Sequence, residues 1–140
     1  MKNGFADKSP YLIPFEQIGD EVSGFLTTTQ QASKLPFRVN RIFWIYKTPP
    51  GEKRGGHANL KTEEVMVAVQ GKAIVRTETI SGKQEEFVLE TPDTGLYIPE
   101  YCWLDITLEP GAILVCMAST DYDGTDYIRD LDEFRNLKTL

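Results

Sequence analysis

Two residues near the middle of the chain, His57 and Glu64, have the types and the spacing that catalytic and metal-binding sites use. They belong to a stretch that reads Gly51, five residues, His57, Ala58, Asn59, four residues, Glu64, six residues and Gly71. His57 is the only histidine of the 140 residues. Because an imidazole titrates near neutral pH, His57 could be a general base or a metal ligand, or it could be a loop residue without a role.

The spacing resembles the motif G-x5-H-x-H-x3or4-E-x6-G of the cupin superfamily of small β-barrels, whose usual function is metal binding. Asn59 stands where that motif has its second histidine. The second cupin motif contains P-x-G-x-x-H, and its histidine position, five residues after Pro99, is Leu104. One imidazole and one carboxylate do not make a good site for a divalent transition ion. We therefore expect no metal.

The elements that position these residues are predicted to be β-strands. Turn signals recur about every 8–12 residues, which is typical of an all-β sandwich or barrel. Segments rich in β-branched and aromatic side chains lie between them, at 38–48, 65–69, 73–80, 84–90, 95–99, 102–109 and 112–119. The glycine of Gln70-Gly71-Lys72 predicts a hairpin between 65–69 and 73–80. Ser81-Gly82-Lys83 predicts a second turn, into 84–90.

Alternation along the strands predicts which side chains face inward. Leu104 belongs to a row of alternate apolar residues that should face the core: Cys102, Leu104, Ile106 and Leu108. His57 and Asn59 share one strand parity and Glu64 has the other, so a bulge or turn is expected between Leu60 and Glu63 if all three face inward.

The end of the chain has a different periodicity. Over 125–137, Ile128, Leu131 and Phe134 recur at helical spacing. This pattern predicts one short amphipathic helix with Thr125 as its N-cap.

Three stretches resemble motifs of the dTDP-sugar 3,4-ketoisomerase family, the WxcM-like cupins: 54-RGGHANLK-61, 95-GLYIPEYCW-103 and 118-ASTDYDGTDYIRDLDEF-134. Members typically show R-G-x-H-A-H-K-K, G-L-Y-x-x-x-x-x-W-H and A-S-x-x-Y-x-E-x-D-Y-I-R. The resemblance covers about residues 18–134, and its last motif is the most specific. It implies one cupin domain over 1–140, an all-β antiparallel barrel or jelly roll with a short C-terminal helix.

The resemblance also implies a reaction. Members are cofactor-free homodimers of bacterial deoxysugar pathways that convert dTDP-4-keto-6-deoxyglucose into its 3-keto isomer. Moving the ketone requires a base that takes a proton from C3, an enediol, and a proton returned at C4. His57 would be that base, because the chain has no other imidazole and the nearby carboxylates would need large upward pKa shifts.

The resemblance assigns roles to five further residues, each with a structural alternative. Asn59 would hold the enediol or cap a turn. Arg54 and Lys61 would receive the diphosphate or be solvated charges. Tyr97 and Trp103 would line the sugar or thymine site or pack against a neighbouring element. For Asp126, Tyr127 and Arg129, a structural role is favoured over ligand contact.

The chain departs from the family pattern at both lost histidines, Asn59 and Leu104, and at Ser23, where an arginine suited to the diphosphate is expected. Two hypotheses follow. The chain is a ketoisomerase with His57 as its single base, or it is a catalytically inactive nucleotide-sugar-binding cupin. A different cupin reaction on another nucleotide sugar is a third alternative.

Composition and apolar run length limit the possible partners and cellular location of the protein. The net charge of −6 disfavours nucleic-acid partners. The longest apolar run, 112–118, is too short to cross a bilayer, and the N-terminus lacks a hydrophobic signal core. Cys102 and Cys116 lie in strand-like stretches and are expected to be buried thiols. These observations favour a cytoplasmic protein without a membrane partner.

Overall fold

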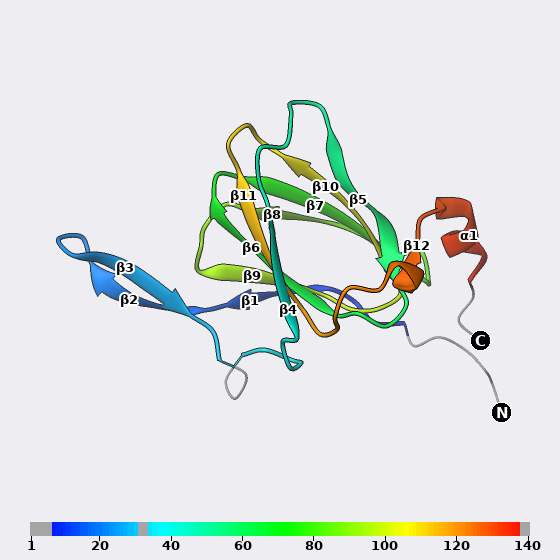
Figure 1. Cartoon of the computed structure of the whole chain (residues 1–140), viewed down its shortest axis with the longest axis horizontal. Coiled ribbons are helices and arrows are strands. Elements are labelled where there is room, and N and C mark those ends of the chain that lie inside the picture. Colours follow the sequence, from blue (N-terminus) through cyan, green and yellow to red (C-terminus); the bar gives the residue numbers. More distant parts are fainter. Residues whose placement is uncertain (1–6, 31–33, 138–140) are drawn as a thin grey trace.

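The computed structural model describes residues 7–30 and 34–137, in which two five-stranded antiparallel sheets face each other (Figure 1). Residues 1–6, 31–33 and 138–140 of the predicted domain lie outside the described part. The first sheet has the order β1 (Tyr11–Pro14), β9 (Thr94–Ile98), β6 (Glu64–Gln70), β11 (Ile113–Ala118), β4 (Arg41–Ile45). The second has the order β12 (Tyr127–Ile128), β5 (Lys53–Asn59), β10 (Cys102–Leu108), β7 (Ala73–Thr79), β8 (Gln84–Leu89). The predicted all-β sandwich of the cupin type is confirmed.

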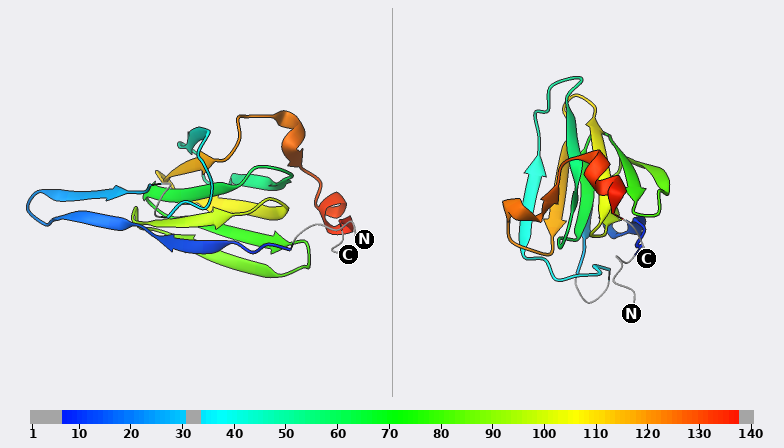
Figure 2. Two further views of the ribbon diagram at one scale, coloured as in Figure 1. Left: turned by 90° about the horizontal axis from the view of Figure 1, so that it is seen from below. Right: turned by 90° about the vertical axis from the view of Figure 1, so that its right-hand side faces the viewer.

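A separate hairpin of β2 (Glu16–Asp20) and β3 (Gly24–Thr28) extends from one end of the sandwich (Figures 1 and 2). The C-terminal helix α1 (Leu131–Asn136) lies at the opposite end. With six residues, α1 is far too short for a membrane span, and no helix of residues 7–30 and 34–137 is long and apolar enough for one. β1, β2 and β3 were not predicted from the sequence, in which the first expected strand begins at residue 38.

The main core lies between the sheets. The predicted inward row of β10 is confirmed, since Cys102, Leu104, Ile106 and Leu108 all belong to this core. Both cysteines are buried free thiols, as expected. On β6, Met66 and Ala68 face inward, whereas Val65 and Val67 pack on the outer face with Phe15, Phe37 and Tyr97. The first sheet is therefore apolar on both faces.

The predicted hairpin at Gly71 is wrong. β6 pairs with β9 and β11, whereas β7 pairs with β10 and β8, so Gly71 connects the two sheets. Its φ of 70° is in the left-handed region, and a Cβ there would lie 2.8 Å from the Cα of Ala112. Glycine is needed at position 71 because the connection between β6 and β7 packs against the connection between β10 and β11, which contains Ala112. The second turn, over 81–83, does join the paired strands β7 and β8.

The predicted helix over 125–137 is also wrong at its start. Residues Gly124–Asp126 form a 3-10 turn, Tyr127–Ile128 pair with β5 as β12, and α1 begins at Leu131. Its N-cap is Asp130, whose Oδ1 accepts from the Glu133 N–H at 3.0 Å. One cluster on the outer face of the second sheet contains Ile128, Leu131 and Phe134. Their regular spacing therefore reflects burial in the same cluster and not one continuous helix.

Candidate active site

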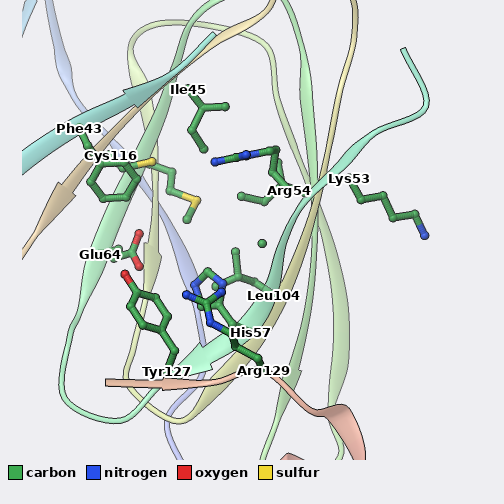
Figure 3. A pocket seen from close by; sticks show the side chains of 13 residues that line it. Phe43, Ile45, Lys53, Arg54, His57, Glu64, Leu104, Cys116, Tyr127 and Arg129 are labelled. Carbon is green, nitrogen blue, oxygen red and sulfur yellow. The ribbon is translucent and has the colours of Figure 1, made fainter. Parts of the chain in front are cut away.

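A cavity of about 280 Å³ lies between the two sheets, where side chains of both reach into the sandwich (Figure 3). The first sheet contributes Phe43, Ile45, Glu64, Met66 and Cys116. The second sheet contributes Lys53, Arg54, Gly55, His57, Leu104 and Ile106. The C-terminal segment adds Tyr127 and Arg129. The cavity therefore has an apolar floor and a ring of ionisable side chains.

A shift of register in β5 brings Arg54 and His57 to the same cavity. The two residues have opposite parity, so a regular strand would point them to opposite faces. The pairing of β5 with β10 shifts between Leu104 and Asp105, and Gly55 lies against this shift with φ of 78°. A Cβ on Gly55 would lie 2.8 Å from the Leu104 carbonyl oxygen. The glycine-rich motif thus lets the chain bulge where both side chains must turn inward.

His57 is placed to act as a neutral base. Burial lowers its pKa from the usual 6.5, and the charge of Arg129 lowers it further. A backbone hydrogen bond with Gly55, the side chain of Asn59 and the charge of Asp105 raise the pKa, but the net direction is downward. Its Nδ1 is buried and has no partner of good hydrogen-bond geometry among the described residues. The downward shift favours the uncharged ring, which can accept a proton.

Glu64 lies on the other sheet and faces the same cavity. It is the first residue of β6, in the inward row that continues with Met66, and it is only 3% exposed. Burial raises the pKa of its carboxyl group to about 7, Arg41 lowers it, and Asp126 adds to the rise. From the sequence, Glu64 was expected only as a possible metal ligand, and the nearby carboxylates were not expected to act as bases. The inward parity of Glu64 and Met66 was the signal that could have found this burial.

Tyr127 and Arg129 line the cavity from the C-terminal segment. The Tyr127 ring meets His57 edge-on at a centroid distance of 4.9 Å, and the Arg129 guanidinium lies 4.5 Å from the Tyr127 ring centroid. From the sequence, a structural role was expected for Tyr127 and Arg129. Their side chains nevertheless reach the cavity, because β12 pairs with β5 beside His57.

Asp126 has the structural role that the sequence predicted. Its buried carboxylate accepts from the Asn59 amide nitrogen at 3.1 Å and from the backbone N–H groups of Lys61 and Thr62 at 2.6 and 3.2 Å. The Thr62 hydroxyl donates to it as well. These bonds hold the connection between Asn59 and Glu64, where β5 ends and β6 begins. The predicted break in the strand between Leu60 and Glu63 is confirmed.

The structure separates the other predicted site residues from the cavity. Asn59 lies beside His57, but its amide donates to Asp126 and it is not among the cavity-lining residues. Lys61 lines a different hollow, next to the acidic loop 120–126. Strand alternation turns Tyr97 onto the outer face of the first sheet and Trp103 onto the outer face of the second, against Phe134. Of the six residues, only His57 and Arg54 therefore line the cavity.

The cavity does not offer a cluster of metal ligands. Over residues 7–30 and 34–137, no three His, Cys, Asp or Glu side chains gather closely enough to hold an ion. Leu104, opposite His57 in the β5–β10 register, is fully buried in the apolar core and has no donor atom.

The family profile described as "FdtA: WxcM-like, C-terminal" matches residues 8–139. The chain belongs to this family. A relative from Aneurinibacillus thermoaerophilus, named TDP-4-oxo-6-deoxy-alpha-D-glucose-3,4-oxoisomerase, is 32% identical over 125 residues, 89% of this chain and 88% of that protein.

Solved structures of sugar 3,4-ketoisomerases share the fold. One is QdtA, a sugar 3,4-ketoisomerase from Thermoanaerobacterium thermosaccharolyticum in complex with TDP, with a TM-score of 0.84, 30% identity and coverage of 91% of this chain and 92% of that one. Another is WlaRA, a TDP-fucose-3,4-ketoisomerase from Campylobacter jejuni, with a TM-score of 0.86, 28% identity and coverage of 94% and 97%. The sequence resemblance to dTDP-sugar 3,4-ketoisomerases is confirmed.

We predict that Asp126→Ala lowers the free energy of unfolding by about 3 kcal/mol or more, because it leaves several buried donors without an acceptor. The matched control is Asp123→Ala. Asp123 accepts from Thr125 in the same loop but is exposed, so its loss should cost about 1 kcal/mol. Urea unfolding measures both. Equal losses would show that Asp126 is not the residue that holds this connection.

Proposed function

We propose that this protein is a TDP-sugar 3,4-ketoisomerase that acts on TDP-4-keto-6-deoxyglucose, with His57 as a general base. The observation that carries the proposal is the half-buried His57 ring that lines the cavity between the sheets, in a chain of the WxcM-like family. The relatives named above are a TDP-4-oxo-6-deoxy-alpha-D-glucose-3,4-oxoisomerase, a sugar 3,4-ketoisomerase in complex with TDP, and a TDP-fucose-3,4-ketoisomerase. The proposal needs no metal or other cofactor, because the reaction moves protons and a double bond within one molecule.

The chemistry suits a neutral imidazole. His57 takes the proton from C3 of the 4-keto sugar, which gives an enediol, and returns it to C4, which leaves the ketone at C3. A burial-lowered pKa keeps the imidazole free to accept this proton at neutral pH. Asn59, whose side chain interacts with His57, would position the ring rather than hold the enediol.

The cations that support diphosphate binding differ from those expected. A second hollow of about 360 Å³ adjoins the cavity and shares Lys53 and Arg54 with it. The Arg54 side chain points into the cavity, whereas the exposed Lys53 side chain points away from it (Figure 3). A diphosphate held by Arg54 at the rim, within reach of Lys53, would connect a sugar beside His57 with a nucleoside beside the aromatic residues of β4. Arg129 adds a third cation to the sugar side, whereas Lys61 lies elsewhere.

One observation favours the alternative, a nucleotide-sugar-binding protein without turnover. Leu104 faces His57 with an apolar side chain, and Asn59 cannot take up a proton, so neither replaces the missing family histidines. Direct assay separates the two functions. The protein is incubated with TDP-4-keto-6-deoxyglucose and the mixture is followed by NMR. Appearance of the 3-keto isomer is expected, and TDP binding without any conversion would establish the alternative instead.

We predict that His57→Asn lowers kcat by about 100-fold or more, the usual contribution of general acid–base catalysis. The dissociation constant of TDP should change little, because Lys53 and Arg54 remain. Single-turnover NMR measures the first quantity and isothermal titration calorimetry the second. Lost TDP binding with unchanged turnover of the bound substrate would make His57 a ligand contact instead.

The proposal includes a homodimer and a cytoplasmic location. The two buried free thiols support a reducing compartment. For the dimer, the support is the set of exposed apolar side chains on the β2–β3 hairpin and on the outer face of the first sheet: Tyr11, Ile18, Phe25, Leu26, Ile42, Trp44 and Val69. A second copy would cover these side chains.

Light scattering should therefore give a mass twice the 15.8 kDa of one chain. Phe25→Glu should shift the mass toward the monomer, because it places a charge in the proposed contact. Val22→Glu is the control, since Val22 is 95% exposed at the tip of the same hairpin. A wild-type protein with the mass of one chain would refute the dimer.

A further inference from the structure

Glu64 has the features of a catalytic carboxyl group that the single-base scheme leaves unused. It is 3% exposed and lines the cavity from the sheet opposite His57 (Figure 3). Within the described part of the chain, its carboxyl group makes no direct hydrogen bond or salt bridge, and the charge of Arg41 is the only attractive one that acts on it. Its oxygens are not among the fully enclosed unpaired atoms, so they face the cavity rather than a structural partner.

We propose that Glu64 is a second catalytic residue, which transfers the proton between the two sugar oxygens while His57 moves the proton between the two carbons. This inference rests on the proposed 3,4-ketoisomerase function. It replaces the single-base scheme by a pair of groups on opposite walls of one cavity.

The steps balance without an external reactant. The neutral imidazole of His57 takes the C3 proton, the C3–H electron pair forms the C3–C4 double bond, the C4=O4 π pair moves onto O4, and O4 takes the proton of the Glu64 carboxylic acid. The enediol then collapses to the 3-ketone: the Glu64 carboxylate takes the proton from O3, the O3–H electrons form the C3 carbonyl, and the C3–C4 π pair takes the imidazolium proton to form the C4–H bond. Both side chains end in their starting protonation states.

The two groups have the protonation states that these roles require. Burial favours the uncharged form of both groups: it lowers the pKa of His57, and it raises that of Glu64 to about 7, so the Glu64 carboxyl group is mostly protonated below that pH. Two groups whose environments move their pKa values in opposite directions are the usual arrangement of an acid and a base. Among the other cavity-lining groups, burial holds the pKa of the Cys116 thiol well above its usual value, which leaves it a poor proton donor.

The pH dependence follows from every charged group around Glu64. These groups are Arg41 of β4, Cys116 of β11, Arg54 and His57 of β5, Asp126 of the 3-10 turn, and Tyr127 and Arg129 of the C-terminal segment. The proton on Glu64 is present below its pKa of about 7 and is lost as the pH rises through it. The base form of His57 is lost only as the pH falls through a value below 6.5. Hence kcat/KM should be highest between these two values and fall above about pH 7.

The test uses Glu64→Gln, which keeps the shape of the side chain but cannot give up a proton in exchange. We expect kcat at pH 6.5 to fall by about 100-fold, with an unchanged TDP dissociation constant and no further fall in kcat/KM on the alkaline side. Glu64→Asp retains a titrating group, so it should lose less activity and keep the alkaline fall. The matched control is Glu63→Gln, because the neighbouring carboxylate accepts from Tyr97 on the outer face and should leave turnover unchanged.

Three results would overturn the inference. The first is a Glu64→Gln variant with kcat close to that of the wild type. The second is an alkaline fall that persists in Glu64→Gln. The third is a loss confined to Tyr127→Phe, which would give the oxygen proton to the tyrosine. In all three the wild type still converts the sugar, so the proposed function stands; a wild type without conversion would overturn both.

Discussion

The buried carboxylate of Asp126 is the interaction on which the site depends. It ties the turn between β5 and β6 to the C-terminal segment, through bonds from Asn59, Lys61 and Thr62. β5 and β6 belong to different sheets, so this turn decides how His57 on one wall stands relative to Glu64 on the other. The same loop leads into β12, which carries Tyr127 to the cavity. The Asp126 carboxylate, which does not line the cavity, thus holds β5, β6 and β12 in place. These strands carry His57, Glu64 and Tyr127.

Desolvation then gives the cavity its chemistry. Removing water disfavours whichever form of a group is charged, so one cause lowers the pKa of His57 and raises that of Glu64. Neither shift requires a dedicated partner, and the apolar floor of Leu104, Ile106 and Met66 supplies the environment for both.

Much of the fold could be predicted from the sequence because its signals are local. Alternation along 102–108 identified the inward face of β10, and the parity conflict between Asn59 and Glu64 identified the break between β5 and β6. The hairpin predicted at Gly71 is wrong because the same glycine turn can lead into a strand that pairs with the previous one or into a strand of the other sheet. That choice depends on contacts such as the one with Ala112, far along the chain.

The candidate site was predicted less well, for a related reason. Family motifs identified His57 and Arg54, but they do not say which face of a sheet a side chain occupies, so Tyr97 and Trp103 were placed at the site although both lie on outer faces. The pKa of Glu64 is a property of its burial by other strands, which the sequence around it does not reveal. Ile128 and Phe134 likewise share a cluster through a strand and a helix, not through one helix.

The placement of His57 and Glu64 on separate sheets means that the width of the site equals the spacing of the sandwich. Facing sheets normally lie about 10 Å apart, and that gap is set by the side chains packed between them. Leu114 and Val75, fully buried between the sheets away from the cavity lining, therefore act as spacers for it. A substitution that changes the side-chain volume at such a position alters the distance between His57 and Glu64. Mutations in the core of this protein therefore also change the geometry of its proposed proton transfers.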